Sequence, residues 1–297
     1  MYFNNLKGII LAGGKGSRLA PLTESISKQL LPVYDKPMIY YPLSTLMLMG
    51  IKDILIITTK RDALLFKNLL GNGENLGISI SYEIQKEPKG IPHAFVLAEK
   101  FISNSKVVLI LGDNIFYGHD LTTQLINCSQ NSSEATIFAY RVQNPSRFGI
   151  INFGKDNKPY FIEEKPEFPK SDFAITGIYI YTSNVVNYSK KLKPSKRGEL
   201  EITDLNNIYM SKNELHVEIL GRGIAWLDTG TFESLQDASL FIKTLEMRQG
   251  LKIGCPEEIA WRLNYIDDSK FEAIAEKYAN SPYGDYLKKV LKEKNIL

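Results

Sequence analysis

Short apolar segments alternate with segments of helical periodicity through the first half of the chain. Five apolar segments predict buried strands, at residues 7–12, 53–59, 79–85, 107–112 and 135–142. The segments between them predict helices, at residues 38–49, 61–70, 92–101 and 121–129. This alternation is typical of a βα-wound, mostly parallel sheet with helices on both faces. Ligands of such sheets bind at the carboxyl ends of the strands, where Gly13, Gln85 and Asp113 are expected.

The pattern changes in the middle of the chain. Residues 149–153, 159–163 and 174–181 predict shorter, partly alternating strands, which we expect as antiparallel additions to the sheet edge. From residue 231 onward the pattern is helical, and Pro256 followed by two glutamates suits a first helical turn. We expect an α/β core over residues 1–240 and a C-terminal helical extension over residues 241–297, packed on the core or on another subunit.

Composition narrows the class of protein. The 297 residues are 44% hydrophobic and 23% charged, with a formal net charge of +3, which is ordinary for a globular protein. A general nucleic-acid binder would show a basic stripe, and none is evident. No apolar run approaches the roughly 20 residues of a membrane span, and the N-terminus lacks the pattern of a signal peptide. We therefore expect a cytoplasmic protein that binds neither nucleic acid nor membrane.

The metal-binding residue types are few. Cys128 and Cys255 lie far apart with no C-x-x-C, and the three histidines lack metal-ligand spacing. This pattern predicts neither a disulfide framework nor a structural zinc site.

Residues 8–31 are the most informative segment. The strand-like residues 9–12 end in a glycine cluster, Gly13-Gly14-Lys-Gly16, followed by Arg18 and Lys28. Glycines let the backbone turn sharply and direct N–H groups at a bound anion. Together with the two cations, they indicate a cradle for a polyphosphate.

Two better-known glycine loops fit poorly. A dinucleotide loop needs G-x-G-x-x-G, but Leu19 replaces the third glycine and the next strand ends without a carboxylate. A P-loop needs Lys-Ser or Lys-Thr after its last glycine, but Gly14-Lys15 follows Gly13. From local chemistry alone, a glycine-rich turn without a ligand stays open.

A wider set of motifs resembles the sugar-phosphate nucleotidylyltransferases. The segment G-G-x-G-x-R-L followed by S-K-Q-L-L-P resembles their signature. Further motifs that match the family occur in the same order along the chain, at residues 34–47, 111–114, 163–166, 197–204 and 223–231. The resemblance covers nearly the whole chain. It implies a Rossmann-like three-layer α/β/α nucleotidyltransferase fold with a mixed, mostly parallel central sheet, whose core has a nucleotide-binding and a sugar-phosphate-binding half.

The resemblance also implies an activity. Within this family, the chain resembles the tetrameric enzymes that transfer a thymidylyl group from dTTP to α-D-glucose 1-phosphate. They release dTDP-glucose and pyrophosphate, the first step of dTDP-L-rhamnose and deoxysugar synthesis. We therefore expect dTTP and glucose 1-phosphate as substrates, Mg2+ as cofactor and a homotetramer.

The required chemistry agrees with the residues present. A sugar 1-phosphate is already a nucleophile, so the protein must overcome repulsion between anions and align the attack, and it needs no catalytic triad. Asp113 and Asp228 each follow a strand-like run, and two carboxylates can hold one magnesium ion. A lone aspartate in such a place is otherwise a turn residue.

The resemblance assigns the site residue by residue. The catalytic residues are Arg18, Lys28 and Asp113, and the metal ligands are Asp113 and Asp228. The nucleotide-binding residues are Leu11, Gly13, Gly14, Gly16, Ser17, Arg18, Gln29, Gln85 and Gly90. The sugar-phosphate-binding residues are Asn114, Gly149, Glu164, Lys165, Ile175 and Arg197.

Two segments depart from the family pattern. The usual Gly-Leu-Ala-Gln-Ala is here Gly-Ile-Pro-His-Ala at residues 90–94, and the usual Arg-Tyr-Gly is Arg-Phe-Gly at residues 147–149. The resemblance places both segments beside the sugar, so the departures bear on glucose as the preferred sugar. We expect His93 on a helix surface and not as an acid or base. UTP, another sugar phosphate or a catalytically silent nucleotide-sugar-binding relative remain alternatives; a nicotinamide-dependent reductase is disfavoured by the loop.

The resemblance implies a second, regulatory nucleotide-sugar site near the C-terminal helices. The matching residues are Gly118, His119, Arg222, Glu258 and Arg262. The alternative is that Glu258 and Arg262 form only a helix i,i+4 ion pair, worth about 0.3–0.5 kcal/mol.

Overall fold

A parallel four-stranded unit forms the centre of the molecule. The computed structural model describes residues 6–131, 133–154 and 158–293. The expectation of no signal peptide concerns the N-terminus, of which residues 1–5 lie outside the described residues. Four parallel strands lie in the order β6-β1-β4-β5. Their bounds are Leu6–Ala12 (β1), Asp53–Thr58 (β4), Ser79–Ile84 (β5) and Lys106–Leu111 (β6). Each agrees with the expected strand to within one residue.

An antiparallel unit extends the sheet beyond β6. It contains β8 (Ala135–Arg141), β9 (Gly149–Phe153), β10 (Pro159–Glu164), β11 (Phe173–Tyr181) and β12 (Leu215–Ile219). β9 and β10 form an edge, as expected. β11 does not, because it pairs with β6, β8 and β9 inside the sheet. Eight of its nine residues are buried, and a strand buried on both faces has no alternation that would reveal its length or place.

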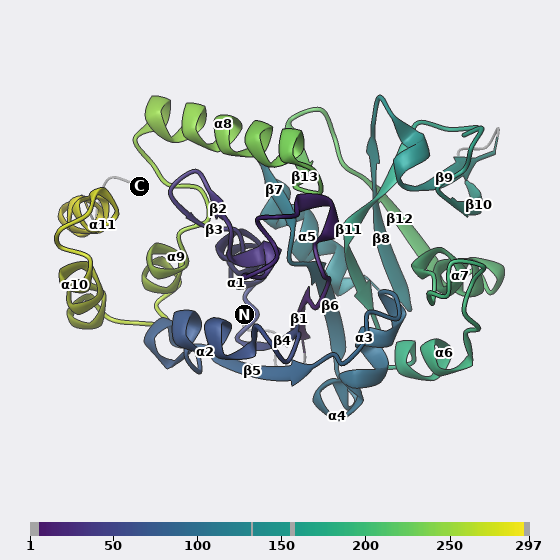
Figure 1. Cartoon of the computed structure of the whole chain (residues 1–297), viewed down its shortest axis with the longest axis horizontal. Helices are drawn as coiled ribbons and strands as arrows, with labels where there is room; N and C mark the ends of the chain where they lie inside the picture. The colour runs from purple at the N-terminus through teal and green to yellow at the C-terminus, as the bar shows by residue number, and fades with distance from the viewer. Residues whose placement is uncertain (1–5, 132, 155–157, 294–297) are drawn as a thin grey trace.

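Helices cover both faces of the sheet (Figure 1). The helices within the first 211 residues are α1 (Tyr40–Leu48), α2 (Ala63–Leu70), α3 (Pro92–Leu97), α4 (Glu99–Ile102), α5 (Leu121–Gln130), α6 (Val185–Lys191) and α7 (Ile202–Ser211). The expected helix at residues 92–101 is divided at Ala98 into α3 and α4. Neighbouring strand residues enter opposite cores: Ile10 packs in the core that holds α1, and Ile9 in the core that holds α3 and α7. This arrangement confirms the three-layer α/β/α class.

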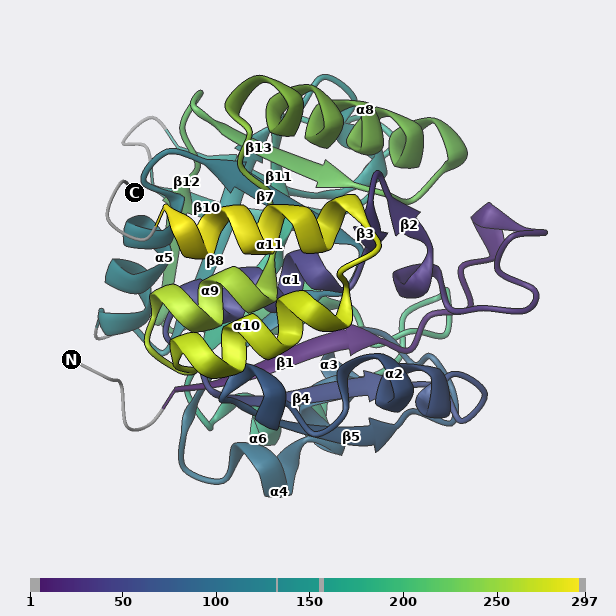
Figure 2. The ribbon, with the colours of Figure 1, turned by 90° about the vertical axis from the view of Figure 1, so that its left-hand side faces the viewer.

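The described C-terminal part, up to residue 293, contains the helices α8 (Phe232–Gln249), α9 (Pro256–Arg262), α10 (Asp268–Lys277) and α11 (Pro282–Lys292). α8 runs unbroken across residues 240 and 241, so the expected division falls inside one helix. Figure 2 shows α9, α10 and α11 grouped on one side of the molecule, over α1. Trp261, Phe271 and Leu287 pack in the same core as Ile10, so these helices bury their apolar faces against the body of the protein.

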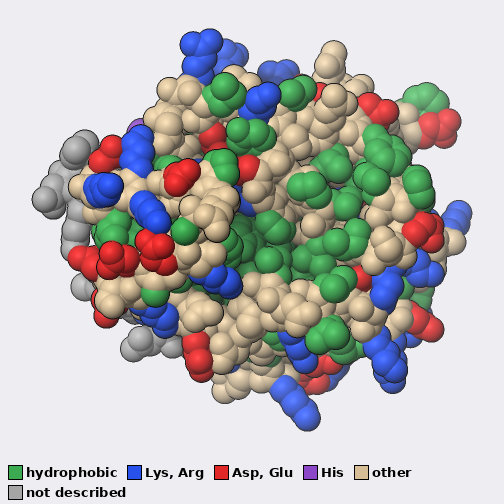
Figure 3. Space-filling view, turned by 60° about the vertical axis from the view of Figure 1, so that its left-hand side comes forward, with side chains coloured by type: hydrophobic (Ala, Val, Ile, Leu, Met, Phe, Trp, Pro, Cys, Tyr) green, Lys and Arg blue, Asp and Glu red, His purple; other side chains and the backbone are tan. Residues whose placement is uncertain are grey.

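Short ribbons and turns finish the architecture. β7 (Asn114–Gly118) pairs with β13 (Ile224–Asp228), and β2 (Pro32–Val33) pairs with β3 (Lys36–Pro37). Among the described residues, the 3-10 turns are η1 (Ser17–Leu19), η2 (Lys28–Leu30), η3 (Glu74–Leu76) and η4 (Pro145–Arg147). In the space-filling view, hydrophobic side chains gather in a hollow near the middle of the face, with charged side chains around it (Figure 3). None of the described helices is both long and apolar enough to cross a lipid bilayer.

Candidate active site

Three strand ends of the parallel unit carry candidate functional residues. Gly13 follows β1, Gln85 follows β5 and Asp113 lies two residues beyond the end of β6. Parallel strands present their carboxyl ends at one edge of a sheet, so these positions share an edge. The sequence-based placement of all three residues at strand ends is confirmed.

The glycine loop lies against Gln85. A Cβ atom built on Gly13 would lie 2.3 Å from the Gln85 Oε1 atom, so only glycine leaves room for the amide. Gly16 has a φ of +63°, a left-handed conformation that favours glycine. By contrast, Gly14 has open space on its Cβ side. The loop therefore holds the Gln85 amide beside the backbone that leads into η1.

Lys28 and Asp113 form the central ion pair. The Lys28 Nζ atom lies 2.5 Å from Asp113 Oδ2, and Lys28 is only 6% exposed. Asn114 donates a hydrogen bond of 2.9 Å to Asp113 Oδ1, and its own Oδ1 accepts one of 2.6 Å from Trp226 Nε1. Burial raises the pKa of Asp113, but the Lys28 charge and the hydrogen bonds from Lys28 and Asn114 outweigh it and hold the pKa below its usual value. Asp113 is therefore ionised at neutral pH and fixed in orientation.

Asp228 faces the same group from the other strand of the ribbon. It ends β13 in register with Asn114, the residue next to Asp113. Burial, followed by repulsion from Asp113, raises the pKa of Asp228, while Arg147, Lys28 and Arg18 act in the opposite direction. Arg147 forms an ion pair with Asp228, since its NH2 atom lies 3.3 Å from Asp228 Oδ2.

The donor set at the end of this ribbon fits a divalent cation, because β13 ends in Asp228 opposite Asn114, and Asp113 directly precedes Asn114. Two carboxylates that repel each other at the end of one ribbon gain most from a shared positive ion, and carboxylate oxygens suit hard divalent cations. Arg18 also reaches the group, since its NH2 atom lies 3.0 Å from the position a Cβ would take on Gly230. The structure thus brings the predicted Arg18, Lys28, Asp113 and Asp228 together.

A second charged group lies on the antiparallel unit. Glu164, at the end of β10, has its Oε1 atom 3.5 Å from Lys165 Nζ and 3.4 Å from Arg197 NH1. Burial raises the pKa of Glu164, Lys165 and Arg197 lower it and Glu201 raises it, with a net upward result. A Cβ on Gly149 would lie 3.3 Å from Glu164 Oε2 and 3.9 Å from Ile175 Cδ1. The expected sugar-phosphate residues Gly149, Glu164, Lys165, Ile175 and Arg197 therefore adjoin one another.

The base-binding segment packs on the segment that carries Arg197. Gly90 has a φ of +96°, and a Cβ there would lie 2.0 Å from the Leu200 carbonyl oxygen. Leu200 donates its N–H to the Lys89 carbonyl at 2.9 Å. Close backbone approach therefore requires the glycine at residue 90 and links the two halves of the site.

Two residues have contacts that the sequence did not indicate. His93 lies in the first turn of α3 and is partly exposed, and its Nδ1 atom lies 3.3 Å from Gln85 Nε2, a contact that the sequence did not indicate. Burial and the nearby Lys89 lower the pKa of His93, partly opposed by Glu87. Arg147 belongs to the Arg-Phe-Gly motif, and its partner Asp228 is 81 residues away. Of these two contacts, only that of His93 had a signal in the sequence, because the family usually has Gln at this position.

The substitution at Phe148 has a local consequence. The Phe148 ring packs on Trp226 with 5.2 Å between centroids, and Trp226 in turn holds Asn114. Phe148 therefore belongs to the aromatic group that supports the Asp113 neighbourhood.

The expected regulatory residues are divided between two places. Gly118, Glu258 and Arg262 line a cavity of about 370 Å³ between α1, β7 and α9. Arg262 Nε lies 2.8 Å from Glu258 Oε1, so the i,i+4 ion pair is present. His119 lines a different cavity, and Arg222 lies in the turn between Gly221 and Gly223 before β13.

Fold and site together define a nucleotidyltransferase. A model of the nucleotidyl transferase family matches residues 7–244, and the chain belongs to this family. Its members typically use a divalent metal. Glucose-1-phosphate thymidylyltransferases are similar over nearly their whole length: that of Neisseria meningitidis is 55% identical, covering 97% of this chain and 100% of the relative. That of Mycolicibacterium smegmatis is 54% identical, covering 96% and 99%.

Solved structures agree with this assignment. A putative glucose-1-phosphate thymidylyltransferase from Bacillus anthracis has a TM-score of 0.74 and 44% identity, covering 80% of this chain and 94% of that one. A UDP-glucose pyrophosphorylase complexed with UDP-glucose has a TM-score of 0.72 and 26% identity, covering 81% and 99%.

Proposed function

We propose that this enzyme transfers a thymidylyl group from dTTP to α-D-glucose 1-phosphate. A phosphate oxygen of the sugar phosphate attacks the α-phosphorus of dTTP, and the bond from that phosphorus to the bridging oxygen of the β-phosphate breaks. The products are dTDP-glucose and pyrophosphate. The observation that carries the proposal is the cluster of Arg18, Lys28, Asp113 and Asp228 at the end of the β7–β13 ribbon, beside the glycine loop.

We propose separate nucleotide-binding and sugar-binding roles for the residues of the site. The proposed nucleotide-binding residues are Leu11, Gly13, Gly14, Gly16, Ser17, Arg18, Gln29, Gln85 and Gly90. The Gln85 amide offers both a hydrogen-bond donor and an acceptor, which matches the imide edge of thymine. The backbone of the glycine loop offers N–H groups to the triphosphate. Held in this way, the α-phosphorus is positioned for attack without a covalent enzyme intermediate.

On the sugar side, Lys165 and Arg197 are proposed to bind the phosphate, and Glu164 to accept bonds from sugar hydroxyls. Asn114, Gly149 and Ile175 complete this side. Asp113 and Asp228 are proposed to hold Mg2+, which when bound offsets the charge that develops on the phosphates. Arg18 and Lys28 supply fixed positive charge to the same phosphates.

A coupled pyrophosphate-release assay across several nucleotides and sugar phosphates tests the proposal. We expect the highest kcat/KM with dTTP and glucose 1-phosphate. A clear preference for UTP or for another sugar 1-phosphate would overturn the substrate assignment. The first substitutions to make would then restore the usual family residues at Ile91, Pro92 and Phe148. Absence of turnover with every pair would favour a catalytically silent relative.

We also propose that the cavity lined by Gly118, Glu258 and Arg262 binds a nucleotide-sugar end product, with His119 and Arg222 contributed within a homotetramer. The supporting observation is a cavity that is lined by neither Asp113 nor Glu164 and contains an arginine able to bind phosphate oxygens. In this proposal residues 1–240 carry out catalysis, residues 241–297 form the regulatory and oligomer region, and the product enters dTDP-L-rhamnose synthesis in the cytoplasm.

A further inference from the structure

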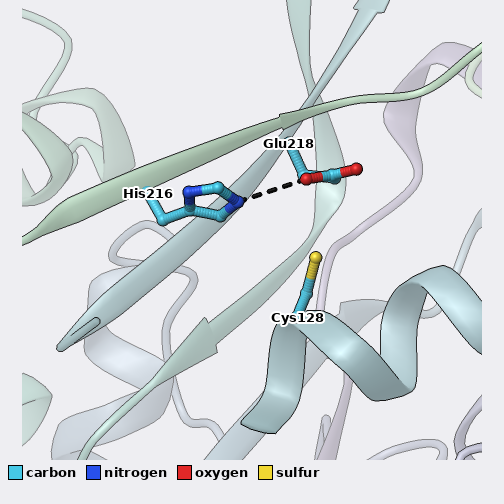
Figure 4. A group of neighbouring side chains, drawn as sticks. All are labelled: Cys128, His216 and Glu218. Carbon is cyan, nitrogen blue, oxygen red and sulfur yellow. Dashed lines mark hydrogen bonds and ion pairs between the residues drawn. The ribbon is translucent and has the colours of Figure 1, made fainter. Parts of the chain in front are cut away.

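A thiol, an imidazole and a carboxylate meet outside the candidate active site, in a cavity that neither Asp113 nor Glu164 lines. Cys128 comes from the last turns of α5, and His216 and Glu218 come from β12 (Figure 4). One ligand atom from each lies within 4.8 Å of those of the other two. The residues span 91 positions of the chain, which is why sequence spacing did not predict a metal site.

Local structure explains the meeting. His216 and Glu218 are two residues apart on one strand, so they project from the same face. β12 pairs in parallel with β8, and α5 leads directly into β8, which places the end of the helix beside that face. Cys128 is buried there, while His216 and Glu218 are partly exposed.

Hydrogen bonds already orient the carboxylate. Glu218 Oε2 lies 3.2 Å from His216 Nε2, and Glu218 Oε1 accepts a bond of 2.5 Å from Gln124 Nε2. Gln124 is four residues before Cys128 on α5, so both side chains lie on one face of the helix. An amide that fixes a ligating carboxylate is the kind of outer partner that metal sites use.

We propose that Cys128, His216 and Glu218 bind a zinc ion. Tetrahedral zinc at about 2.0–2.3 Å from S, N and O atoms places its ligand atoms roughly 3.5 Å apart, so small side-chain rotations close the cluster. A thiolate and a carboxylate match the charge of the ion, and a soft sulfur donor with an imidazole favours zinc over magnesium.

The surroundings suit a cation with one open position. The cluster lines an open cavity of about 910 Å³, from which water can supply the fourth ligand. The described residues that line this cavity include no lysine or arginine. The ion would join α5 to β12 and stabilise that region. The cavity also reaches Ile224, at the opposite end of the β7–β13 ribbon from Asp228, so the ion would lie at the other end of that ribbon from the proposed magnesium site.

Cobalt binding to the full-length, metal-stripped protein tests the proposal. Co2+ replaces zinc in such sites, and its bond to a thiolate gives a near-ultraviolet charge-transfer band that Mg2+ sites of oxygen ligands do not give. We expect this band at about one Co2+ per chain, with excess Mg2+ present, and its loss on adding Zn2+. Zinc alone should raise the unfolding temperature by roughly 5 °C at saturation.

Matched variants assign the ligands. Cys128→Ser should abolish the band, and His216→Gln and Glu218→Gln should each weaken Co2+ binding at least 10-fold. Cys255→Ser removes the other cysteine, which is buried elsewhere, and should keep the band. No band in the folded wild-type protein, or a band that survives Cys128→Ser and disappears with Cys255→Ser, would overturn the proposal. Circular dichroism of each metal-free variant checks its fold, and the two remaining variants decide the matter if Cys128→Ser does not fold.

Discussion

The ammonium of Lys28 lies 2.5 Å from the carboxylate of Asp113, although the two residues are 85 positions apart in the chain. Lys28 begins η2, shortly after the glycine loop, and Asp113 follows β6. The contact therefore joins the segment proposed to bind the triphosphate to the carboxylate proposed to bind the metal. Because Lys28 is almost fully buried, this pair is fixed before any substrate arrives.

The metal assignment predicts the effect of neutral isosteres. Asp113→Asn and Asp228→Asn should each reduce kcat by on the order of 100-fold or more, as the loss of a transition-state electrostatic partner does. Pyrophosphate release at saturating Mg2+ measures this, with Asp237→Asn on exposed α8 as the control. Near-normal rates in both variants would contradict the assignment.

The glycine loop offers a matched pair of substitutions. In Gly13→Ala the new methyl group meets the Gln85 amide at 2.3 Å, so Gln85 must move, and KM for dTTP should rise about 10-fold or more through loss of its hydrogen bonds. Gly14→Ala places the methyl group in open space, so its unfolding temperature should equal that of the wild type. Calorimetry of both variants and dTTP titration of Gly13→Ala give the comparison. An unchanged dTTP affinity in Gly13→Ala would remove Gln85 from the base site.

The two cations beside Glu164 should act on one substrate. Lys165→Ala and Arg197→Ala should weaken glucose 1-phosphate binding by about 10-fold or more, since each removes a charge-assisted hydrogen bond, and should leave dTTP binding nearly unchanged. Isothermal titration with each substrate separately measures this division. Loss of dTTP binding with intact sugar-phosphate binding would reverse the assigned roles.

Regulation is tested at Arg262. Arg262→Ala should relieve inhibition by a dTDP-sugar end product without lowering basal turnover, because the residue lies away from Asp113 and Glu164. Arg222→Ala should do the same if neighbouring subunits complete the site. Inhibition curves for both variants, with Arg248→Ala on exposed α8 as the control, measure the coupling between the sites. Equal inhibition of Arg262→Ala and wild type would leave Arg262 as only the partner of Glu258.

A buried ion network joins the β2–β3 turn to the C-terminal helices. Lys36 Nζ lies 2.5 Å from Asp35 Oδ1 and 2.8 Å from Glu246 Oε1, and Lys252 contacts both carboxylates. The Lys36 side chain is 1% exposed. Glu246→Gln should therefore destabilise the protein by about 2 kcal/mol or more, because it leaves a buried ammonium with one partner fewer.

The same network predicts a pH dependence of stability. Burial raises the pKa of Asp35, but Lys36 and Lys252 outweigh it, so the pKa in the folded protein lies below its usual value. The unfolded chain then binds more protons in this range. The stabilisation by Asp35 is complete above the unfolded pKa of about 3.9 and is lost as the pH falls through the folded pKa. Urea unfolding should show a stability difference between wild type and Asp35→Asn at pH 6 that shrinks below about pH 4. A difference that grows toward acid pH would contradict the sign.

Local pattern determined a large part of this protein. The apolar runs at residues 7–12, 53–59 and 107–112 form parallel strands, because successive side chains are mostly buried on the two faces of the sheet. The glycine cluster follows β1 as expected. The placement of Gly13, Gln85 and Asp113 at one edge followed from the rule for parallel strands. The sequence motifs shared with the family supplied the remaining candidate site residues, Arg18, Lys28 and Asp228.

Tertiary structure decided the pairings between distant segments. The sequence did not place β11 inside the sheet, Arg147 beside Asp228, His93 against Gln85, or Cys128 beside His216. Each of these contacts depends on strand order and register, which arise from packing the whole core. Hydrophobic periodicity reports only whether a residue is buried and not which distant residue it faces, so such contacts are specified by the sum of many weak packing energies along the chain.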